Sequence, residues 1–439
     1  MRQHSTAAES RHATEPMALD QEWNDLLGEI RSLDGFADFL RPPRLDSLSR
    51  AAAGGSIVVV NVSRWRSDAL VVTTDGVQPP LELPSASREA TVDWTVRYLD
   101  AVHRFQVAEQ LAYESQRRFR EGDRSPAAFQ AYHAAATKLH TERLLMESVV
   151  TAVLDWLWTA IAEPVLSFLK FTQTPGDGTW PRLWWCPTGV LTALPLHAAG
   201  RYGEGEAGLS VLDRVISSYT PTLRALLEAT SAPATDPAKA DAESRMLVVA
   251  VPDAAGQTPL PNVAREVDLL ATLFPGDRST VLRGAAATRT RVREELGRHR
   301  WAHFSCHGHQ DITDPSNGGL LLHDGTLTVQ NIGAGTYQGE FAFLSACKTA
   351  TGGLDLADEL ITLAAALHYA GYRQVVATLW SVYDPTAADV VESVYTELTG
   401  NGRFDSRGAA QALHRVVRRL RDRYPASPSV WTPFIHVGP

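Results

Sequence analysis

WAHFSCHGH (residues 301–309) and FAFLSACKT (residues 341–349) are the two stretches that decide the fold. Each begins with a short apolar run, typical of a buried strand, and continues into residues that can act as base or nucleophile: His307 in the first and Cys347 in the second. The spacing of forty residues between these two side chains suits neighbouring parallel strands. Ligands gather beyond the carboxyl ends of such strands, so the pattern predicts a site there.

Short apolar runs alternate with helical patterns on both sides of these stretches. Strands are predicted at residues 246–251, 301–306, 341–346 and 374–380, and helices at 262–273, 290–296, 360–369, 387–398 and 409–424. Strands that alternate with helices form βαβ units. The pattern therefore predicts an α/β fold whose mainly parallel sheet is flanked by helices.

The residues before position 245 have a different pattern. A helix is predicted at 23–40, strands at 57–62 and 68–73, helices from about 92 to 172, and a strand and turn at 184–195. Residues 231–244, SAPATDPAKADAES, are small, polar and contain proline, which is typical of a linker. We therefore expect, in chain order, a flexible leader (1–20), an N-terminal α/β half (21–230), a linker (231–244) and a second half (245–439).

Composition limits the class of protein. The 439 residues are 44% hydrophobic and 21% charged, which excludes a largely disordered chain, and the net charge of −9 does not favour binding to nucleic acid. Cys186, Cys306 and Cys347 are too few and too scattered for a disulfide framework, so a reducing, cytoplasmic location is expected. The first twenty residues lack the apolar core of a signal peptide, and no window of about 18 uncharged apolar residues predicts a membrane span.

The pairing of Cys347 with His307 suits nucleophilic catalysis. Thiolate is the attacking species, so a neutral imidazole within hydrogen-bond reach has to take the thiol proton, or an imidazolium has to stabilise the thiolate. Lys348 and a helix that begins near Asp355 would both favour the thiolate. The backbone amides of Gly308 and Cys347 are candidates for an oxyanion hole, because glycine leaves room for close approach.

Three blocks carry a family resemblance: HFSCHG (303–308), LSACKTATGG (344–353) and LHYAGYRQVVATLWSVYDP (367–385). Together they resemble the CHAT family of caspase-like cysteine proteases, which is related to separase, and similar segments extend from about residue 35 to residue 438. The resemblance implies a caspase-like fold with a catalytically silent N-terminal half. It also implies peptide-bond hydrolysis through an acyl-enzyme, without a cofactor, in which His307 matches the catalytic histidine and Cys347 the nucleophile.

The resemblance further implies where the residue before the scissile bond binds. In this family and in separase, the acidic residue after the LW strand lies near that pocket, and here it is Asp384, with Trp380 at the end of the strand. A carboxylate in this position selects arginine or lysine through charge-assisted hydrogen bonds. Asp358 and Glu359 are competing candidates, and Asp384 could instead cap the helix after Pro385.

Other interpretations stay open. Cys347 could be a small buried apolar residue and His307 a core histidine. The cluster of His303, Cys306, His307 and His309 invites a zinc site, but no second ligand pair accompanies it, so no metal is expected. The runner-up function is a catalytically silent CHAT scaffold that acts as a protein-interaction module. An acyl transferase or a non-proteolytic hydrolase with the same dyad is a third possibility.

The expected partners follow from the leading interpretation, a cysteine endopeptidase of regulated, limited proteolysis in signalling or defence, as the family implies. Its substrate is a protein or peptide, and an activating protein partner or repeat domain is considered because family members often follow TPR repeats. No repeat of 20–50 residues is visible in this sequence. The arginine-rich run at 415–423 is interpreted as the solvated side of a helix, so neither nucleic acid nor membrane is expected as a partner.

Overall fold

The computed structural model describes residues 20–33, 36, 39–41, 49–176, 178–203, 205–231, 245–254, 257–309, 314–345, 363–380, 382, 384–400 and 402–439. The chain divides into two units, residues 1–48 and residues 49–439. The leader and the linker expected at 1–20 and 231–244 lie almost entirely outside the described residues.

The first unit contains a helix over residues 20–32. The prediction of one helix over 23–40 is therefore wrong beyond residue 32, as far as the described residues extend. There the backbone amides of Phe36 and Phe39 donate to the carbonyls of Leu33 and Phe36, three residues earlier. Apolar residues spaced by three continue as single turns, which periodicity alone does not distinguish from an α-helix.

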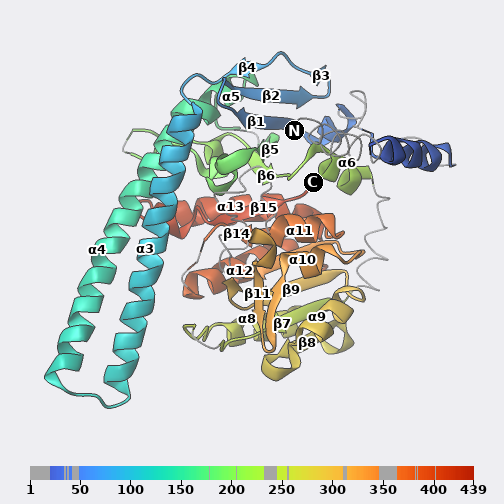
Figure 1. Cartoon of the computed structure of the whole chain (residues 1–439). Coiled ribbons are helices and arrows are strands. Elements are labelled where there is room, and N and C mark those ends of the chain that lie inside the picture. Colours follow the sequence, from blue (N-terminus) through green and yellow to red (C-terminus); the bar gives the residue numbers. More distant parts are fainter. Residues whose placement is uncertain are drawn as a thin grey trace, which may run out of the picture. The chain divides into compact units, whose positions relative to one another are not determined.

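The second unit is built on one twelve-stranded sheet (Figure 1). Its strands are β1 (Ser56–Val62), β2 (Ser67–Thr73), β3 (Gly76–Val77), β4 (Leu81–Glu82), β5 (Arg182–Pro187), β6 (Ile216–Tyr219), β7 (Met246–Ala250), β8 (Ser279–Arg283), β9 (Trp301–Ser305), β13 (Phe341–Ser345), β14 (Gln374–Thr378) and β15 (Phe434–Val437). They follow the order β3-β2-β1-β5-β6-β15-β14-β13-β9-β7-β8, and β4 pairs with β2. Neighbours are parallel from β1 to β15 and from β14 to β8, and antiparallel elsewhere. The predicted α/β fold with a mainly parallel sheet is confirmed.

The four strands predicted in the second half are confirmed as β7, β9, β13 and β14. Their side chains are almost all buried, as expected for strands that are covered on both faces. β13 lies parallel beside β9 with Ser345 opposite Ser305, as the forty-residue spacing of the two deciding stretches predicts. The short strands β6, β8 and β15 were not predicted, nor was a small antiparallel sheet of β10 (Gly308–His309), β11 (Gly319–Leu322) and β12 (Gly325–Thr328).

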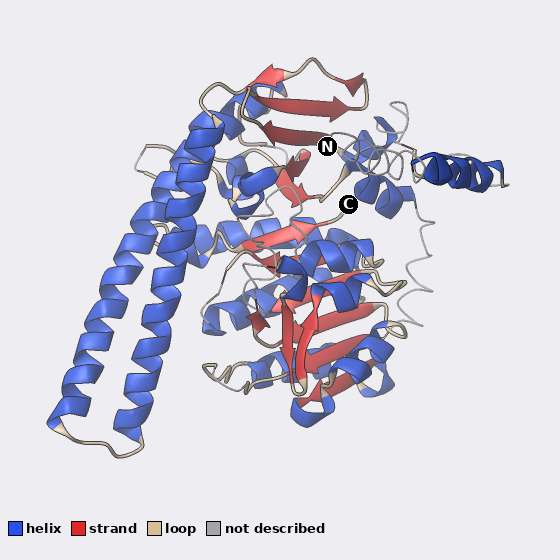
Figure 2. Cartoon of the chain, viewed as in Figure 1, coloured by secondary structure: helices blue, strands red, loops and turns tan. Residues whose placement is uncertain are grey.

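Helices flank the strands of this sheet (Figure 2). After residue 220 they are α6 (Leu223–Ser231), α8 (Val263–Leu273), α9 (Arg289–Leu296), α10 (Val329–Gly333), α11 (Leu363–Tyr369), α12 (Asp384–Leu398) and α13 (Ala409–Arg423). The helices predicted at 262–273, 290–296, 387–398 and 409–424 are confirmed, as is the described part of the one predicted at 360–369.

Two long helices, α3 (Arg88–Arg120) and α4 (Pro126–Leu157), run side by side as an antiparallel hairpin (Figure 1). Ser125 begins α4 by accepting a hydrogen bond from the amide of Ala128, and Pro126 follows at the first helical position. From residue 109 to residue 141 no side chain is buried. In the part of the chain that the structure describes, no other element buries the side chains of the outer part of the hairpin.

One helix of the described chain, Pro126–Phe168, which joins α4 to α5 (Glu163–Phe168) through a π-helical turn at Trp158–Ala162, is long and apolar enough to cross a membrane. Its most apolar window has a mean hydropathy of 1.5, and 44% of that window is buried inside the protein. Core helices of globular proteins have the same length and composition, so the feature supports a membrane span only weakly.

A buried chain of hydrogen bonds crosses the sheet where the two halves meet. Arg182 Nη2 donates to Ser218 Oγ at 2.9 Å, Ser218 Oγ lies 2.7 Å from His436 Nδ1, and His436 Nε2 lies 2.7 Å from Gln374 Oε1. These residues belong to four adjacent strands, β5, β6, β15 and β14. The C-terminal strand β15 thus joins the strands of the first half to those of the second.

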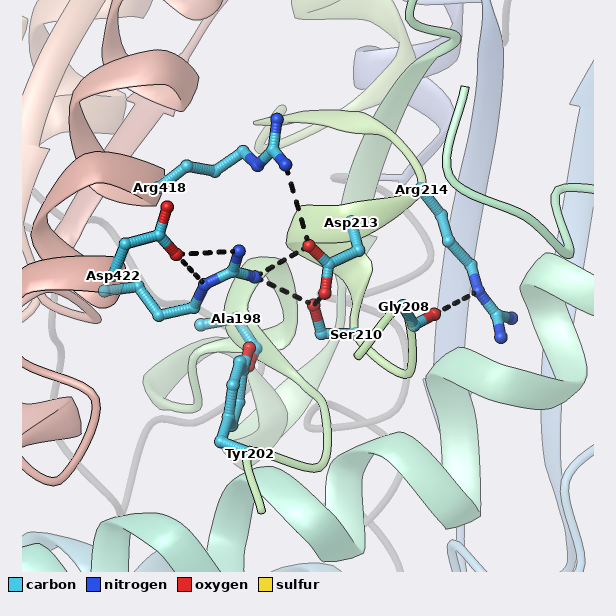
Figure 3. A network of polar contacts seen from close by, with 9 residues as sticks. Ala198, Tyr202, Gly208, Ser210, Asp213, Arg214, Arg418 and Asp422 are labelled. Atoms are coloured by element: carbon cyan, nitrogen blue, oxygen red, sulfur yellow. Dashed lines mark hydrogen bonds and ion pairs between the residues drawn. The ribbon is translucent and has the colours of Figure 1, made fainter. Parts of the chain in front are cut away.

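An ion cluster joins the same two halves outside the sheet (Figure 3). Asp213, which precedes β6, accepts from Arg421 Nη1 at 2.8 Å, and Arg418 Nη2 lies 3.9 Å from the same carboxylate oxygen. Both arginines come from α13. Ser210 Oγ donates to the other carboxylate oxygen at 2.7 Å, so the Asp213 carboxylate is held from both sides.

Candidate active site

His307 follows β9 by two residues, at the carboxyl end of the strand, and is only 6% exposed. Its Nε2 lies 2.8 Å from the backbone carbonyl oxygen of Thr258. A carbonyl only accepts hydrogen bonds, so Nε2 carries a proton, and in the neutral imidazole Nδ1 therefore keeps its lone pair. Burial lowers the pKa of His307 below its ordinary value, while the Thr258 carbonyl and the Asp384 carboxylate act in the opposite direction. The arrangement favours a neutral imidazole that can accept a proton at Nδ1.

Hydrogen bonds connect the loop that carries the Thr258 carbonyl to α12. Asn262, at the start of α8, donates to Asp384 Oδ2 from its backbone amide at 3.0 Å and from its side-chain amide at 2.6 Å. Asp384 is the first residue of α12. One carboxylate therefore holds the loop whose carbonyl fixes the orientation of His307.

Asp384 also lines a small cavity of about 30 Å³, which is room for about one water molecule. Glu266, Cys306 and Ser345 line the same cavity. Oδ1 of Asp384 accepts no hydrogen bond from any residue that the structure describes. Asp384 thus combines a structural bond to α8 with one carboxylate oxygen that accepts from none of the described residues.

Trp380 and Gly308, two other residues predicted for the site, lie near the same edge of the sheet. Trp380 follows β14, is 2% exposed and packs edge to face on Tyr98 of α3, with ring centroids 5.5 Å apart. Gly308 begins β10 and lies opposite Leu320 of β11. The carbonyl of His307 accepts from the amide of Leu321 at 2.8 Å, so β11 fixes the backbone on which the candidate oxyanion-hole amide of Gly308 lies.

The structure also contains a buried polar cluster around Glu266, which was not predicted from the sequence. Glu266 of α8 is 3% exposed; its Oε1 accepts from Ser345 Oγ at 2.9 Å, and its Oε2 accepts from His303 Nε2 at 3.0 Å and from the Ser305 hydroxyl. His303 Nδ1 lies 3.2 Å from the Tyr395 hydroxyl. His303, which the sequence placed among candidate zinc ligands, is thus a hydrogen-bonding residue inside β9.

A signal for Glu266 is present in the sequence. It stands three residues after Val263 and four before Leu270, both of which are buried, so it occupies the apolar face of α8. A carboxylate on such a face has to find hydrogen-bond donors inside the protein. Thr258 acts only through its carbonyl and Asn262 only through amides, so the sequence holds no comparable signal for them.

Several predicted site residues lie outside the described residues: Cys347, Lys348, Asp355, Asp358 and Glu359. Ser345, two positions before Cys347 in the sequence, is described, and it pairs with Ser305, two positions before His307. Among the described residues, no group of three or more His, Cys, Asp or Glu side chains is placed to hold a metal ion.

Comparison with known proteins defines the class of protein. The CHAT domain family matches residues 151–439, which is more than half of the chain, and the chain therefore belongs to the CHAT family. The fold is that of the caspase-like cysteine proteases. A chain of the Saccharomyces cerevisiae separase–securin complex is similar over 90% of this chain, at 10% sequence identity and a TM-score of 0.56.

The matched chain of the separase–securin complex is much longer than the present chain. The present chain spans 31% of that chain of the separase–securin complex, about a third of its length. The Porphyromonas gingivalis protein RgpB, solved as a complex of pro- and mature domains, matches with 11% identity and a TM-score of 0.42, over 66% of this chain and 76% of that one. No curated protein matches this chain.

Proposed function

We propose that this protein is a cysteine endopeptidase in which Cys347 is the nucleophile and His307 the general base. Nδ1 of the neutral imidazole takes the thiol proton, and the sulfur attacks the carbonyl carbon of the scissile peptide bond. The backbone amides of Gly308 and Cys347 stabilise the oxyanion. His307 then protonates the leaving amine, and water hydrolyses the thioester that remains.

One observation supports this function above the others: the hydrogen bond from His307 Nε2 to the Thr258 carbonyl. It fixes a tautomer in which the lone pair is on Nδ1. A lone pair that is free to accept a proton is what a general base requires. The register of β9 and β13 also supports the pairing, because the strand that precedes Cys347 in the sequence is the neighbour of the strand that precedes His307.

Cleavage after a basic residue is part of the proposal. Oδ1 of Asp384, which accepts no hydrogen bond from a described residue, can accept from a guanidinium or an ammonium group, and the negative charge of the carboxylate compensates theirs. The cavity beside it holds about one water, so an arginine side chain has to displace the lining before it can enter. Asp358 and Glu359 remain the competing carboxylates.

The small size of the cavity is also the observation that favours the second candidate, a CHAT scaffold that binds proteins without cutting them. If the cavity stays this small in the functional state, no basic side chain reaches Asp384. Separase, which has this fold, forms a complex with securin, another protein. By analogy, we propose that a protein partner or a repeat domain opens the site of this protein in the cytoplasm.

A fluorogenic peptide panel separates the two candidates. Peptides with Arg, Lys, Asp or Leu before the scissile bond are incubated with the wild type, with Cys347→Ala and with His307→Ala. We expect hydrolysis after Arg and Lys by the wild type and none by either variant. Equal activity in Cys347→Ala rejects the site, and cleavage after Asp or Leu rejects the basic preference. No hydrolysis by any form, with or without candidate partners, favours the scaffold.

A further inference from the structure

The Glu266 carboxylate connects three elements at the edge of the sheet where the proposed site lies. It belongs to α8, and it accepts hydrogen bonds from Ser305 at the end of β9 and from Ser345 at the end of β13. A hydroxyl donates only one hydrogen bond, so each serine commits its proton to the same carboxylate. The two strand ends are thus bonded to one carboxylate.

The chain positions of these serines connect the cluster to the proposed chemistry. Ser305 stands two residues before His307, and Ser345 stands two residues before Cys347. Ser305 and Ser345 face each other in the β9–β13 pair. Glu266 therefore binds the last residue of each of the two strands that precede the proposed catalytic residues in the sequence.

Burial explains why a carboxylate suits this task. Glu266 is 3% exposed, and His303 and Tyr395, the titratable groups of the cluster, are 0% exposed. A buried carboxylate requires several donors, and here it receives three, which together define its position. Both of its oxygens accept, whereas an amide offers one acceptor and one donor group. Glutamine at this position cannot accept from both serines and the imidazole at once.

We propose that Glu266 is a positioning residue: it holds the ends of β9 and β13 at the spacing that brings His307 and Cys347 into reach. This inference rests on the proposed function. It assigns Glu266 no contact with substrate and no proton transfer. Glu266 is also bonded to His303 on β9, and His303 in turn contacts Tyr395 on α12. These two contacts help to hold the Glu266 carboxylate in its position.

The test compares Glu266→Gln and Ser345→Ala with the wild type. Glu266→Gln keeps the shape of the side chain and changes one acceptor into a donor, while Ser345→Ala removes a single donor. A misplaced pair of reacting groups lowers kcat more than KM, so we expect kcat to fall roughly 10- to 100-fold while KM changes by less than about threefold. Glu295→Gln is the matched control.

Glu295 suits this purpose because it is equally buried, at 6% exposed, and bonds charged groups of the same half of the protein. It lies on α9 and touches neither strand end of the site. Glu295→Gln is expected to keep kcat within about twofold of the wild type. Circular dichroism and thermal unfolding confirm that each variant folds, and Ser345→Ala carries the test alone if Glu266→Gln does not.

A second measurement tests, without a substrate, whether His307 activates the Cys347 thiol. The rate of Cys347 alkylation by iodoacetamide is followed at about pH 6 by peptide mapping, which distinguishes Cys347 from Cys186 and Cys306. We expect the wild-type rate to fall about tenfold in His307→Ala and by a similar factor in Ser345→Ala.

The outcomes separate the two proposals. If the wild type is active and both Glu266→Gln and Ser345→Ala keep its kcat and its alkylation rate, the positioning role is overturned and the proposed function stands. If His307→Ala leaves both hydrolysis and alkylation of the wild type unchanged, the dyad itself is absent, and the proposed function falls together with this inference.

Discussion

Two buried histidines near the junction of the two halves, His197 and His414, should make the protein lose stability between about pH 7.5 and pH 5.5. Burial lowers the pKa of each to about 3, and for His414 the charges of Arg418 and Arg421 add to the effect. The two side chains are 5% and 7% exposed. His197 contacts the Tyr219 hydroxyl through Nδ1 at 3.0 Å.

The sign follows from proton counting. In the unfolded chain a histidine has a pKa of about 6.5, so below that pH the unfolded state binds a proton that the folded state does not. The stabilisation is therefore present above pH 6.5 and declines as the pH falls, by about 1.4 kcal/mol per histidine between pH 7.5 and pH 5.5. Burial raises the pKa of Glu147, which opposes the decline at the acidic end of the range.

Urea unfolding of the wild type, His197→Gln and His414→Gln at both pH values isolates each contribution. A glutamine variant is less stable at every pH, but it has no imidazole to titrate. We expect each variant to lose about 1.4 kcal/mol less than the wild type on acidification. A wild type and variants that lose the same free energy, within about 0.3 kcal/mol, would refute the burial argument.

Three further predictions concern single residues. Asp384→Asn removes a charge that raises the pKa of His307, so that pKa should fall further in an NMR titration of the imidazole; an unchanged value contradicts the proximity. Ser218→Ala leaves buried groups of Arg182 and His436 without partners, and urea unfolding should show a loss of about 2–4 kcal/mol. Gly371→Ala places a Cβ 1.9 Å from a backbone oxygen at φ +115°, so thermal unfolding should show a destabilisation above roughly 2 kcal/mol. A normal melting temperature for that variant would contradict the backbone geometry.

The central strands could be predicted because each carries its own signal. β7, β9 and β14 are buried throughout, so their sequences are mainly apolar and can be recognised without knowledge of the neighbouring strands. β15, with four residues, and β6, also with four, are too short for such a signal. Their place is set by pairing with β14 and β5, at a distance in sequence that periodicity does not report.

The helices predicted from about residue 92 to residue 172 are confirmed as α3, α4 and α5, but the position of the turn between α3 and α4, at residues 121–125, was not predicted. Gly122, with φ +111°, and the Ser125-Pro126 pair at the start of α4 mark this turn. Both signals are present in the sequence, and the apolar periodicity on either side outweighed them.

Some groups of the candidate site could be predicted from the sequence and others could not. His307 could be selected from the sequence because it follows an apolar strand with reactive chemistry, and Asp384 because the family resemblance points to the acidic residue after the LW strand. The groups that orient them, the Thr258 carbonyl and the amides of Asn262, are backbone atoms or common side chains whose role exists only after folding. Sequence reasoning thus finds the chemical groups of a site more readily than the loop that fixes their direction.

The family match extends across residues 231–244, the segment whose composition is typical of a linker. It begins at residue 151, within α4, and so includes β5 and β6 of the first half. β15, at the other end of the chain, lies between β6 and β14. Without β6, one edge of β15 would expose unpaired backbone groups, and without β15 the same would hold for β14. Strand pairing across 231–244 therefore makes residues on both sides of that segment parts of one sheet.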